Sequence, residues 1–229
     1  MKKALVLFSG GVDSTTALAL AIEKYGKDNV IALSVVYGQK HDKEFECSCK
    51  IARYYCVEHI YLDLSKIFEY SDCTLLKHSS KEVPHEAYEE QIKETNGKPV
   101  STYVPFRNGL FLSSAASIAI SKECEVIYYG AHRDDACGNA YPDCSEAFTK
   151  AINEAIYLGS GNQVKVYGPF VGMSKKDIVA IGLKLNVPYE LTWSCYEGHE
   201  KACGKCGTCI DRKKAFEANG VKDPIEYEE

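Results

Sequence analysis

The sequence has no apolar run long enough to cross a membrane and no excess of basic residues. A membrane helix needs about 18 consecutive apolar residues, and no stretch approaches that length. The 27 Lys and Arg residues are outnumbered by 32 Asp and Glu residues, which gives a formal net charge of −5. A broad nucleic-acid-binding surface needs the opposite balance. Neither a membrane nor a nucleic acid is therefore expected as a direct partner.

The sequence also shows no signal peptide, no internal repeat and no low-complexity tract. A predicted strand begins at residue 4, which leaves no room for a leader before the fold, so a cytoplasmic location is expected. Disulfides are rare in such a reducing compartment, and the odd total of 11 cysteines also argues against them. Most cysteines outside a C-terminal cluster are expected to be small packed residues: Cys47, Cys49, Cys56, Cys73, Cys124, Cys137 and Cys144.

The chain lacks both a Walker A lysine and the dinucleotide fingerprint, yet it carries a glycine turn of another kind. Residues 4–8 (ALVLF) are typical of a buried parallel strand, and residues 15–25 have the apolar spacing of a helix. The turn SGGVDS, residues 9–14, lies between them. Free N–H groups and the dipole at a helix N-terminus favour an anion, and paired glycines let the backbone approach it. The stretch therefore predicts a phosphate site.

Asp13 is an unusual residue for a phosphate site, and the whole stretch also has an alternative interpretation. A carboxylate would repel bound phosphates unless it holds Mg²⁺ or caps the helix, and the sequence leaves both readings open. The alternative for the whole stretch is an ordinary strand-to-helix turn capped by Asp13 or Ser14. A nucleotide is the expected ligand, and its expected contacts are Phe8, Ser9, Gly10, Gly11, Val12, Asp13, Ser14, Thr15, Thr16, Ala17 and Leu18.

Further strands and helices indicate the fold class. Strands are predicted over 29–36, 59–62, 125–130 and 164–167, and helices over 42–55, 110–122, 145–158 and 174–185. Such alternation with short connections predicts an α/β fold with a doubly wound, mainly parallel sheet, whose ligands lie beyond the carboxyl ends of its strands. Residues 66–100 fit no such pattern and are expected to form either a lid or a disordered loop.

Several polar residues follow the predicted strands or precede the predicted helices. Lys40 and His41 come directly after the second strand and either face the nucleotide or form a surface turn. Arg107 stands at a helix N-terminus, where its guanidinium suits a phosphate or carboxylate; the alternative is a solvated arginine beside a cap. Asp143 precedes the helix over 145–158 and is either its N-cap or a ligand contact. Ser174 and Asp177 predict a capping box.

Four cysteines near the C-terminus have the spacing of a metal site. Cys195, Cys203, Cys206 and Cys209 follow the pattern C-x7-C-x2-C-x2-C. Four soft ligands suit tetrahedral Zn²⁺, and four thiolates would close the coordination sphere, so the site is expected to be structural. An iron–sulfur cluster also accepts four cysteines, and four unligated thiols are the plain alternative. Nearby cations are expected to offset the thiolate charge: Lys201, Lys205, Arg212, Lys213 and Lys214.

The turn SGGVDS resembles the PP-loop of the ATP pyrophosphatases, which belong to the adenine nucleotide alpha-hydrolase-like superfamily. Joined to the four cysteines, it resembles one family within it, the 7-cyano-7-deazaguanine synthases of queuosine biosynthesis (QueC). The matching segments span nearly the whole chain: SGGVDS (9–14), YGQKH (37–41), VPFRN (104–108), YPDC (141–144), VPYELTWSCY (187–196) and CGKCGTCIDR (203–212). Two departures, Phe106 and Asn139-Ala140, fall near the expected base pocket.

The resemblance implies a reaction and a set of roles. ATP with Mg²⁺ would adenylate 7-carboxy-7-deazaguanine, ammonia would give the amide, and a second activation would give 7-cyano-7-deazaguanine. It implies a nucleotide-binding domain over residues 1–190, a zinc lobe over residues 191–229, and a homodimer with each zinc lobe near the partner subunit. The expected catalytic residues are Asp13, Ser14 and Arg107, and the expected substrate contacts are Arg107, Tyr141, Asp143 and Lys175.

Three rival functions stay open at this point. The first is a related enzyme that stops at the amide. The two departures near the expected base pocket leave this alternative open. A tRNA thiolase also combines a PP-loop with cysteines, but the acidic net charge and a closed four-thiolate site count against it. A zinc-ribbon binding module without ATP turnover is the third, and the intact glycine turn argues against it.

Overall fold

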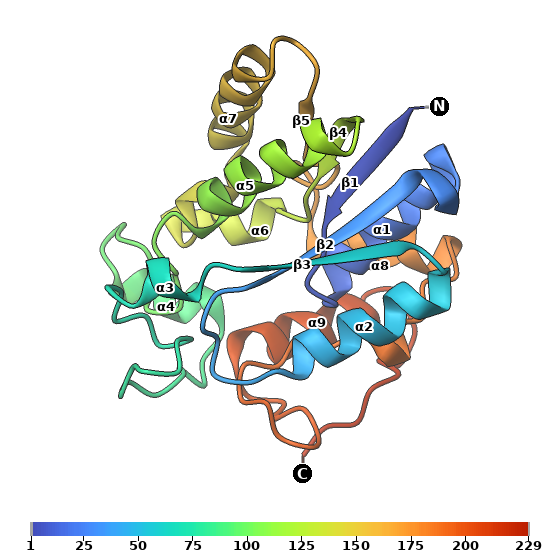
Figure 1. Cartoon of the computed structure of the whole chain (residues 1–229). Helices are drawn as coiled ribbons and strands as arrows, with labels where there is room; N and C mark the ends of the chain where they lie inside the picture. Colours follow the sequence, from blue (N-terminus) through green and yellow to red (C-terminus); the bar gives the residue numbers. More distant parts are fainter. Residues whose placement is uncertain (1, 229) are drawn as a thin grey trace.

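The computed structural model describes residues 2–228, which form one parallel five-stranded sheet with helices on both sides (Figure 1). The strand order is β3-β2-β1-β4-β5. The strands are β1 (Lys3–Leu7), β2 (Val30–Val36), β3 (Glu58–Asp63), β4 (Cys124–Tyr128) and β5 (Lys165–Tyr167). The α-helices are α1 (Val12–Tyr25), α2 (Lys43–Tyr55), α3 (Ser65–Phe68), α4 (Tyr88–Glu94), α5 (Arg107–Ser121), α6 (Arg133–Ala136), α7 (Glu146–Gly159), α8 (Lys175–Lys184) and α9 (Gly207–Glu217).

Alternate residues of the strands face two separate hydrophobic clusters. In β1, Leu5 and Leu7 belong to the cluster that includes residues of α5 and α7, whereas Ala4 and Val6 belong to the cluster with α1, α2 and α8. Successive side chains of a strand point to opposite faces, so a strand that is apolar throughout must be covered on both. The doubly wound α/β fold expected from the sequence is therefore confirmed.

The sheet changes direction beside β1. The chain runs from β1 outward through β2 to β3, then returns to the other side of β1 as β4 and continues to β5. Leu5 of β1 pairs with Ile31 on one side and Ile127 on the other. At such a switch the connections leave in opposite directions and open a crevice at the carboxyl ends. The glycine turn after β1 lies at this edge.

The predicted elements exist, with boundaries that differ by a few residues. Helix α1 begins three residues before the predicted start, and α5 likewise begins at Arg107 instead of residue 110. The capping box of α8 is present: Ser174 accepts from the Asp177 amide, and Asp177 accepts from the Ser174 amide. Residues 66–100 are not wholly irregular, because they include the short helix α4. No described helix is long and apolar enough to span a membrane.

The scattered cysteines are less uniformly packed than expected. Cys73, Cys124 and Cys144 are buried, but Cys56 and Cys137 are exposed. Cys56 ends α2 in the left-handed region at φ 54°. Burial therefore explains only part of this group.

An ion pair inside the C-terminal segment fixes α9 to the rest of the chain. Arg212 is fully buried and forms a two-pronged contact with Asp223, with Nε–Oδ2 and Nη2–Oδ1 distances of 2.7 and 3.0 Å. The same guanidinium donates to the Thr192 hydroxyl at 2.8 Å and to the Tyr189 carbonyl at 3.1 Å. The expectation that Arg212 offsets the thiolate charge misses this role. Its charge is balanced by Asp223 instead.

Replacing Arg212 with methionine is expected to lower the free energy of unfolding by about 3–5 kcal/mol, because it leaves the Asp223 carboxylate buried without its cation. Urea denaturation would measure the loss. Lys214→Met, at an exposed position of the same helix, is the matched control. Adding Asp223→Asn should restore part of the stability by removing the unpaired charge. Equal stability of the Arg212 and Lys214 variants would show that the buried pair contributes nothing.

Candidate functional site

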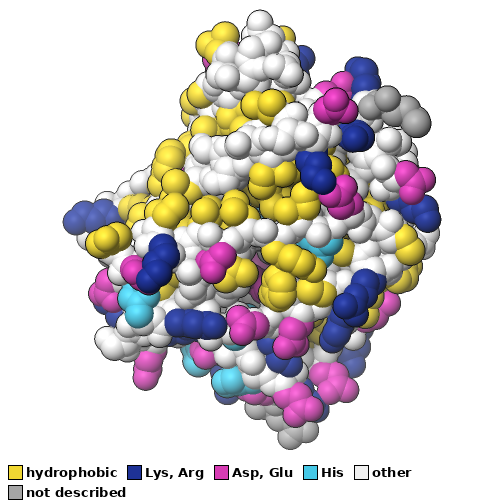
Figure 2. Space-filling view, viewed as in Figure 1, with side chains coloured by type: hydrophobic (Ala, Val, Ile, Leu, Met, Phe, Trp, Pro, Cys, Tyr) yellow, Lys and Arg dark blue, Asp and Glu magenta, His cyan; other side chains and the backbone are white. Residues whose placement is uncertain are grey.

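A cavity of about 220 Å³ lies at the carboxyl edge of β1, β2 and β4. Its wall combines the glycine turn with residues from the starts of α2, α5 and α8 and from the C-terminal segment. In Figure 2 charged side chains lie over the lower part of the visible face and at its upper right, while apolar side chains gather at the upper left and across the middle. The cavity thus lies at the sheet edge that the topology predicts for a ligand.

The glycine turn contributes five of its expected nucleotide contacts to this wall: Phe8, Ser9, Gly11, Asp13 and Ser14. The Ser9 and Ser14 hydroxyl oxygens are 3.0 Å apart, and Ser14 Oγ accepts from the Ser9 amide at 3.2 Å. Gly11 is the N-cap of α1 and has no side-chain cap. The alternative reading, in which Asp13 or Ser14 caps the helix, is therefore wrong. The first-turn N–H groups stay available to an anion.

The other expected nucleotide contacts lie outside the cavity wall. Thr15 and Thr16 donate their hydroxyls to carbonyls one turn earlier, at 2.7 and 2.8 Å, so those hydroxyls are already engaged within the helix. Ala17 and Leu18 belong to the core beneath the sheet. Gly10 lies against α2 with φ +86°. Six expected contacts are thus absent from the cavity wall: Gly10, Val12, Thr15, Thr16, Ala17 and Leu18.

Asp13 forms an ion pair at the bottom of the site. Lys175 Nζ, at the first position of α8, lies 3.0 Å from Asp13 Oδ2. Burial would raise the pKa of the Asp13 carboxyl, but the charge of Lys175 holds it below its ordinary value, so Asp13 is ionised at neutral pH. The second oxygen, Oδ1, is buried without a hydrogen-bond partner among residues 2–228. An orphaned carboxylate oxygen beside a phosphate loop fits a Mg²⁺ ligand.

A buried histidine adjoins the same pair. His132 Nε2 lies 3.8 Å from Asp13 Oδ2 and 3.3 Å from Asp135 Oδ2, and the His132 side chain is only 1% exposed. Asp135 lines the cavity, and the neighbouring Asp134 accepts from the Lys175 amide at 2.8 Å. The loop after β4 thus holds the Lys175 end of the site in place. The sequence had placed this loop at a carboxyl end without assigning it a role.

Arg107 reaches the cavity from the first position of α5. Its guanidinium lies over the Tyr37 ring at 5.3 Å, and Nη1 is 3.4 Å from the Tyr37 hydroxyl. The Arg107 guanidinium has no carboxylate within ion-pair distance among the described residues. A planar cation held on an aromatic ring and facing a cavity can bind an anionic group of a ligand. The reading of Arg107 as a solvated surface residue is not supported.

Two expected substrate contacts, Tyr141 and Asp143, do not line the cavity. Asp143 Oδ2 accepts from the Asn108 amide at 2.8 Å, so it caps α5 from outside that helix. It is not the N-cap of α7, as the sequence had suggested; that position belongs to Ser145. Tyr141 is buried and bonded through its hydroxyl to Thr102 and Tyr88. Both residues act on the site through the elements that they hold.

The irregular excursion of residues 66–100 is anchored to the site by tyrosine hydroxyls. Tyr88 from α4 bonds to Tyr196 of the C-terminal segment at 2.7 Å and lies 3.2 Å from Tyr141. Tyr88 and Tyr196 both line the cavity. The sequence left open whether this excursion is a lid or disordered. In the structure its middle forms one wall of the cavity.

Sequence reasoning missed several cavity residues. Gln39 and Glu44 line the cavity, whereas Lys40 and His41, for which the sequence leaves a nucleotide contact and a surface turn open, line a smaller hollow beside it. Glu44 lies three residues beyond the quoted segment YGQKH, where helix α2 has begun. The departures expected near the base pocket, Phe106 and Asn139-Ala140, are not in the cavity wall.

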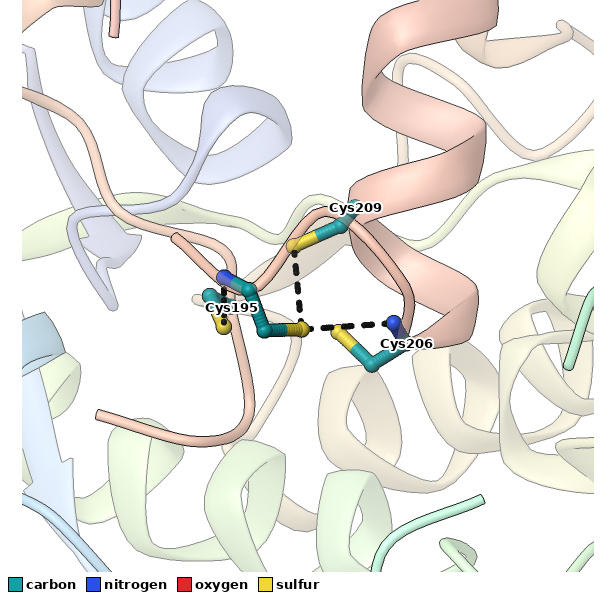
Figure 3. Close-up of side chains that lie close together, drawn as sticks. Cys195, Cys206 and Cys209 are labelled. Atoms are coloured by element: carbon teal, nitrogen blue, oxygen red, sulfur yellow. Dashed lines mark hydrogen bonds between the residues drawn. The ribbon is translucent and has the colours of Figure 1, made fainter. Parts of the chain in front are cut away.

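The four C-terminal cysteines converge on one point. Their sulfur atoms all lie within 4.8 Å of one another, and all four residues are buried. Figure 3 shows Cys195, Cys206 and Cys209 arranged around this point. A tetrahedral zinc with Zn–S bonds of about 2.3 Å places its sulfurs about 3.8 Å apart. The Cys203–Cys209 sulfur distance is 3.9 Å, so the geometry fits a metal held by four thiolates.

Backbone amides already point at these sulfurs. The Cys203 amide donates to Cys195 Sγ, and the Cys206 amide donates to Cys203 Sγ, each at 3.3 Å. Hydrogen bonds of this kind stabilise the charged thiolate over the neutral thiol. With all four positions taken by protein ligands, the site has no open position for a substrate.

The C-terminal segment also closes the cavity. The Trp193 amide donates to the Gly10 carbonyl at 3.0 Å, which joins the segment directly to the glycine turn. Trp193, Ser194, Tyr196 and Thr208 line the cavity, and each lies within two residues of a cysteine of the cluster. The metal site therefore supports the wall of the cavity at a short distance along the chain.

Comparisons with known proteins point to one family. The family model described as "Queuosine biosynthesis protein QueC" matches residues 3–220. A 7-cyano-7-deazaguanine synthase from Archaeoglobus fulgidus is 45% identical over 97% of this chain and 89% of its own length. One from Caldicellulosiruptor saccharolyticus is 44% identical over 99% of this chain and 96% of its own length.

Solved structures share the fold at low identity. The U34-tRNA thiolase NcsA from Methanococcus maripaludis with its [4Fe-4S] cluster has a TM-score of 0.52 at 17% identity, covering 95% of this chain and 67% of that one. An NH3-dependent NAD synthetase from Campylobacter jejuni has a TM-score of 0.50 at 15% identity, covering 82% and 66%. At these identities the likeness supports the fold alone.

Proposed function

Because the chain belongs to the QueC family of queuosine biosynthesis proteins, we propose that it makes 7-cyano-7-deazaguanine from 7-carboxy-7-deazaguanine, ammonia and ATP. One observation carries the proposal. The uncapped glycine turn and the residues next to a closed four-cysteine site line the same cavity. The turn suits the phosphates of ATP, and the cysteines leave no open metal position for a thiolation cluster.

The reaction requires two adenylation steps at the same carboxyl carbon, first on a carboxylate oxygen and then on the amide oxygen. The substrate carboxylate attacks the α-phosphorus of ATP, and pyrophosphate leaves. Ammonia then attacks the acyl carbon, and AMP leaves with the electron pair of the broken C–O bond, which gives the amide. The amide oxygen is adenylated in turn, and loss of AMP with two N–H protons leaves the nitrile. In both activations negative charge accumulates on phosphate oxygens.

The described residues meet this demand at different places. The α1 N-terminus with Ser9 and Ser14 would hold the phosphates, and Arg107 would hold the carboxylate or the α-phosphate from the opposite wall. Asp13, through its free Oδ1, would hold Mg²⁺, which when bound offsets charge on the transferring phosphates. Lys175 fixes Asp13 and adds a positive charge at the same end.

Tyr141 and Asp143 serve the reaction as positioning residues in this proposal. Asp143 caps the helix that carries Arg107, and Tyr141 ties the cavity wall to the loop before α7. We also propose Zn²⁺ as the metal of the cysteine site, a boundary between a nucleotide-binding domain and a zinc lobe at residues 190–191, a homodimer and a cytoplasmic location. These assignments rest on the sequence and on the family.

The test is a mass-spectrometric assay of the purified protein with ATP, Mg²⁺, ammonium and 7-carboxy-7-deazaguanine. We expect the nitrile to form with two AMP released for each base converted. Accumulation of the amide alone would replace the proposal by a single-activation enzyme. An unchanged base with ATP still bound would leave the family membership and remove the substrate, and retained partner binding without ATP turnover would favour a binding module.

A further inference from the structure

A small hollow opens beside the main cavity. Its volume is about 10 Å³, which is room for one molecule of the size of water. Tyr37, Gln39, Glu44 and Tyr196 line both the hollow and the main cavity, so the two spaces adjoin along these side chains. Leu75 lines the hollow on the side of the 66–100 excursion. The space is too small for a nucleotide, a base or an amino acid.

Glu44 stands where the two spaces meet, and its carboxylate is unpaired. Among residues 2–228 no cation lies within ion-pair distance of the Glu44 carboxylate, and no donor is hydrogen-bonded to it. The other cavity carboxylates differ in this respect: Asp13 is paired with Lys175, and Asp135 lies 3.3 Å from His132. Glu44 is thus the acidic side chain of the cavity wall that is free to meet a positive ligand.

The remaining polar atoms of the hollow suit a small hydrogen-bond donor. The Tyr37 hydroxyl oxygen accepts a hydrogen bond from Arg107 Nη1 and can accept one more. His41 Nδ1 is buried and has no partner among the described residues. Lys40, the cation of this wall, is engaged elsewhere, because its Nζ donates to the Lys81 carbonyl at 2.7 Å. A small cation with several N–H groups matches this set of acceptors.

We propose that the hollow binds ammonium, the nitrogen donor of the proposed function, and that Glu44 takes the proton that converts ammonium into nucleophilic ammonia. The inference rests on the proposed function, since it assigns the site of one of its substrates. Glu44 lies in the first turn of α2, and the backbone of this turn packs against the glycine turn. The packing is so close that a Cβ added to Gly10 would lie 2.7 Å from the Glu44 carbonyl oxygen. Because Glu44 also lines the main cavity together with Ser9 and Ser14, ammonia released at its carboxylate enters the space that the glycine turn borders.

The step balances in atoms and charge. Glu44 accepts one proton from ammonium. The resulting ammonia forms a C–N bond with the acyl carbon, the C–O bond to AMP breaks, and a second proton passes from nitrogen to the phosphate of AMP or to water. Burial raises the pKa of the Glu44 carboxyl to about 7, although the charge of Arg107 opposes the rise. A carboxyl in this range exchanges protons readily at neutral pH.

The test uses two substrates, the acid 7-carboxy-7-deazaguanine and the corresponding amide. Conversion of the amide to the nitrile needs ATP but no ammonium, so a residue that acts only on ammonium should affect conversion of the acid alone. Glu44→Gln is compared with Glu46→Gln, an exposed position on the same helix. For conversion of the acid, Glu44→Gln should raise the KM for ammonium at least about tenfold, and Glu44→Asp should recover part of the loss. For conversion of the amide, Glu44→Gln should stay within about twofold of the wild type.

Two outcomes with folded protein decide against the proposal. Equal losses in acid and amide conversion would mean that Glu44 contacts the base or the nucleotide. An unchanged KM for ammonium would remove the hollow from the reaction. If thermal unfolding shows that Glu44→Gln is not folded, the same comparison is made with Glu44→Asp, whose KM for ammonium alone should rise. Wild-type protein that converts neither acid nor amide would overturn the proposed function itself.

Discussion

Replacing Asp13 with alanine is expected to lower kcat by about 10³-fold or more while the protein stays folded. The reason is that the two oxygens of this carboxylate have different surroundings. Oδ2 is paired with Lys175, whereas Oδ1 is buried without a hydrogen-bond partner among residues 2–228. Since the pKa of Asp13 lies below its ordinary value, the group is charged throughout the neutral range. Its removal therefore deletes a real charge at the phosphate end of the cavity.

Two variants make this result interpretable. Asp13→Asn keeps the size and most of the polarity of the side chain but not the charge, so it should lose nearly as much activity as Asp13→Ala. Asp28→Ala, at an exposed position three residues beyond the C-terminal end of α1, should retain full activity. Steady-state turnover and thermal unfolding would be measured for all three. Full activity of the Asp13→Ala protein would remove the proposed metal or phosphate role.

Replacing Cys206 with serine is expected to release the metal and to loosen the C-terminal segment. Structural zinc sites in isolated zinc-finger peptides contribute about 10–16 kcal/mol, more than any single contact in this segment. Because Trp193, Tyr196 and Thr208 line the cavity, the variant should also lose activity without any change in the glycine turn. Elemental analysis and limited proteolysis would measure both effects.

The control for this prediction is Cys137→Ser, because Cys137 is exposed and lies outside the cluster. It should retain one equivalent of zinc and resist proteolysis as the wild type does. A metal-free wild type with an intact C-terminal segment and full turnover would contradict the structural role of the site. An iron content in place of zinc would correct the metal and leave the role.

Local patterns predicted the features that depend on neighbouring residues. The strand and helix around SGGVDS, the capping box of Ser174 and Asp177, and the cysteine spacing each lie within a few residues of sequence. Their physical causes are local as well: hydrogen bonds one turn apart, glycine conformations and ligand spacing. The parallel sheet with helices on both faces followed from the alternation of strands and helices, whereas the order of its strands came from the structure.

The cavity wall could not be predicted in the same way, because it is assembled across long separations. Tyr88 and Tyr196 meet through hydroxyls 108 residues apart, and nothing near either tyrosine marks it as a partner of the other. The sequence reads Asp143 as the N-cap of the helix that follows it or as a ligand contact, but its carboxylate caps α5, which ends before it in sequence. Glu44 carried no signal because an acidic residue in the first turn of a helix is ordinary.

The contact between the Trp193 amide and the Gly10 carbonyl has a consequence for the order of synthesis. A ribosome makes the glycine turn first and the segment that closes the cavity last. At roughly 5–20 residues per second, on the order of 10 s separates the two. Until then the nascent chain carries the glycine turn without Trp193 and Tyr196, which complete the wall of the cavity. The order of synthesis thus makes the closure of the cavity one of the last events in the formation of this fold.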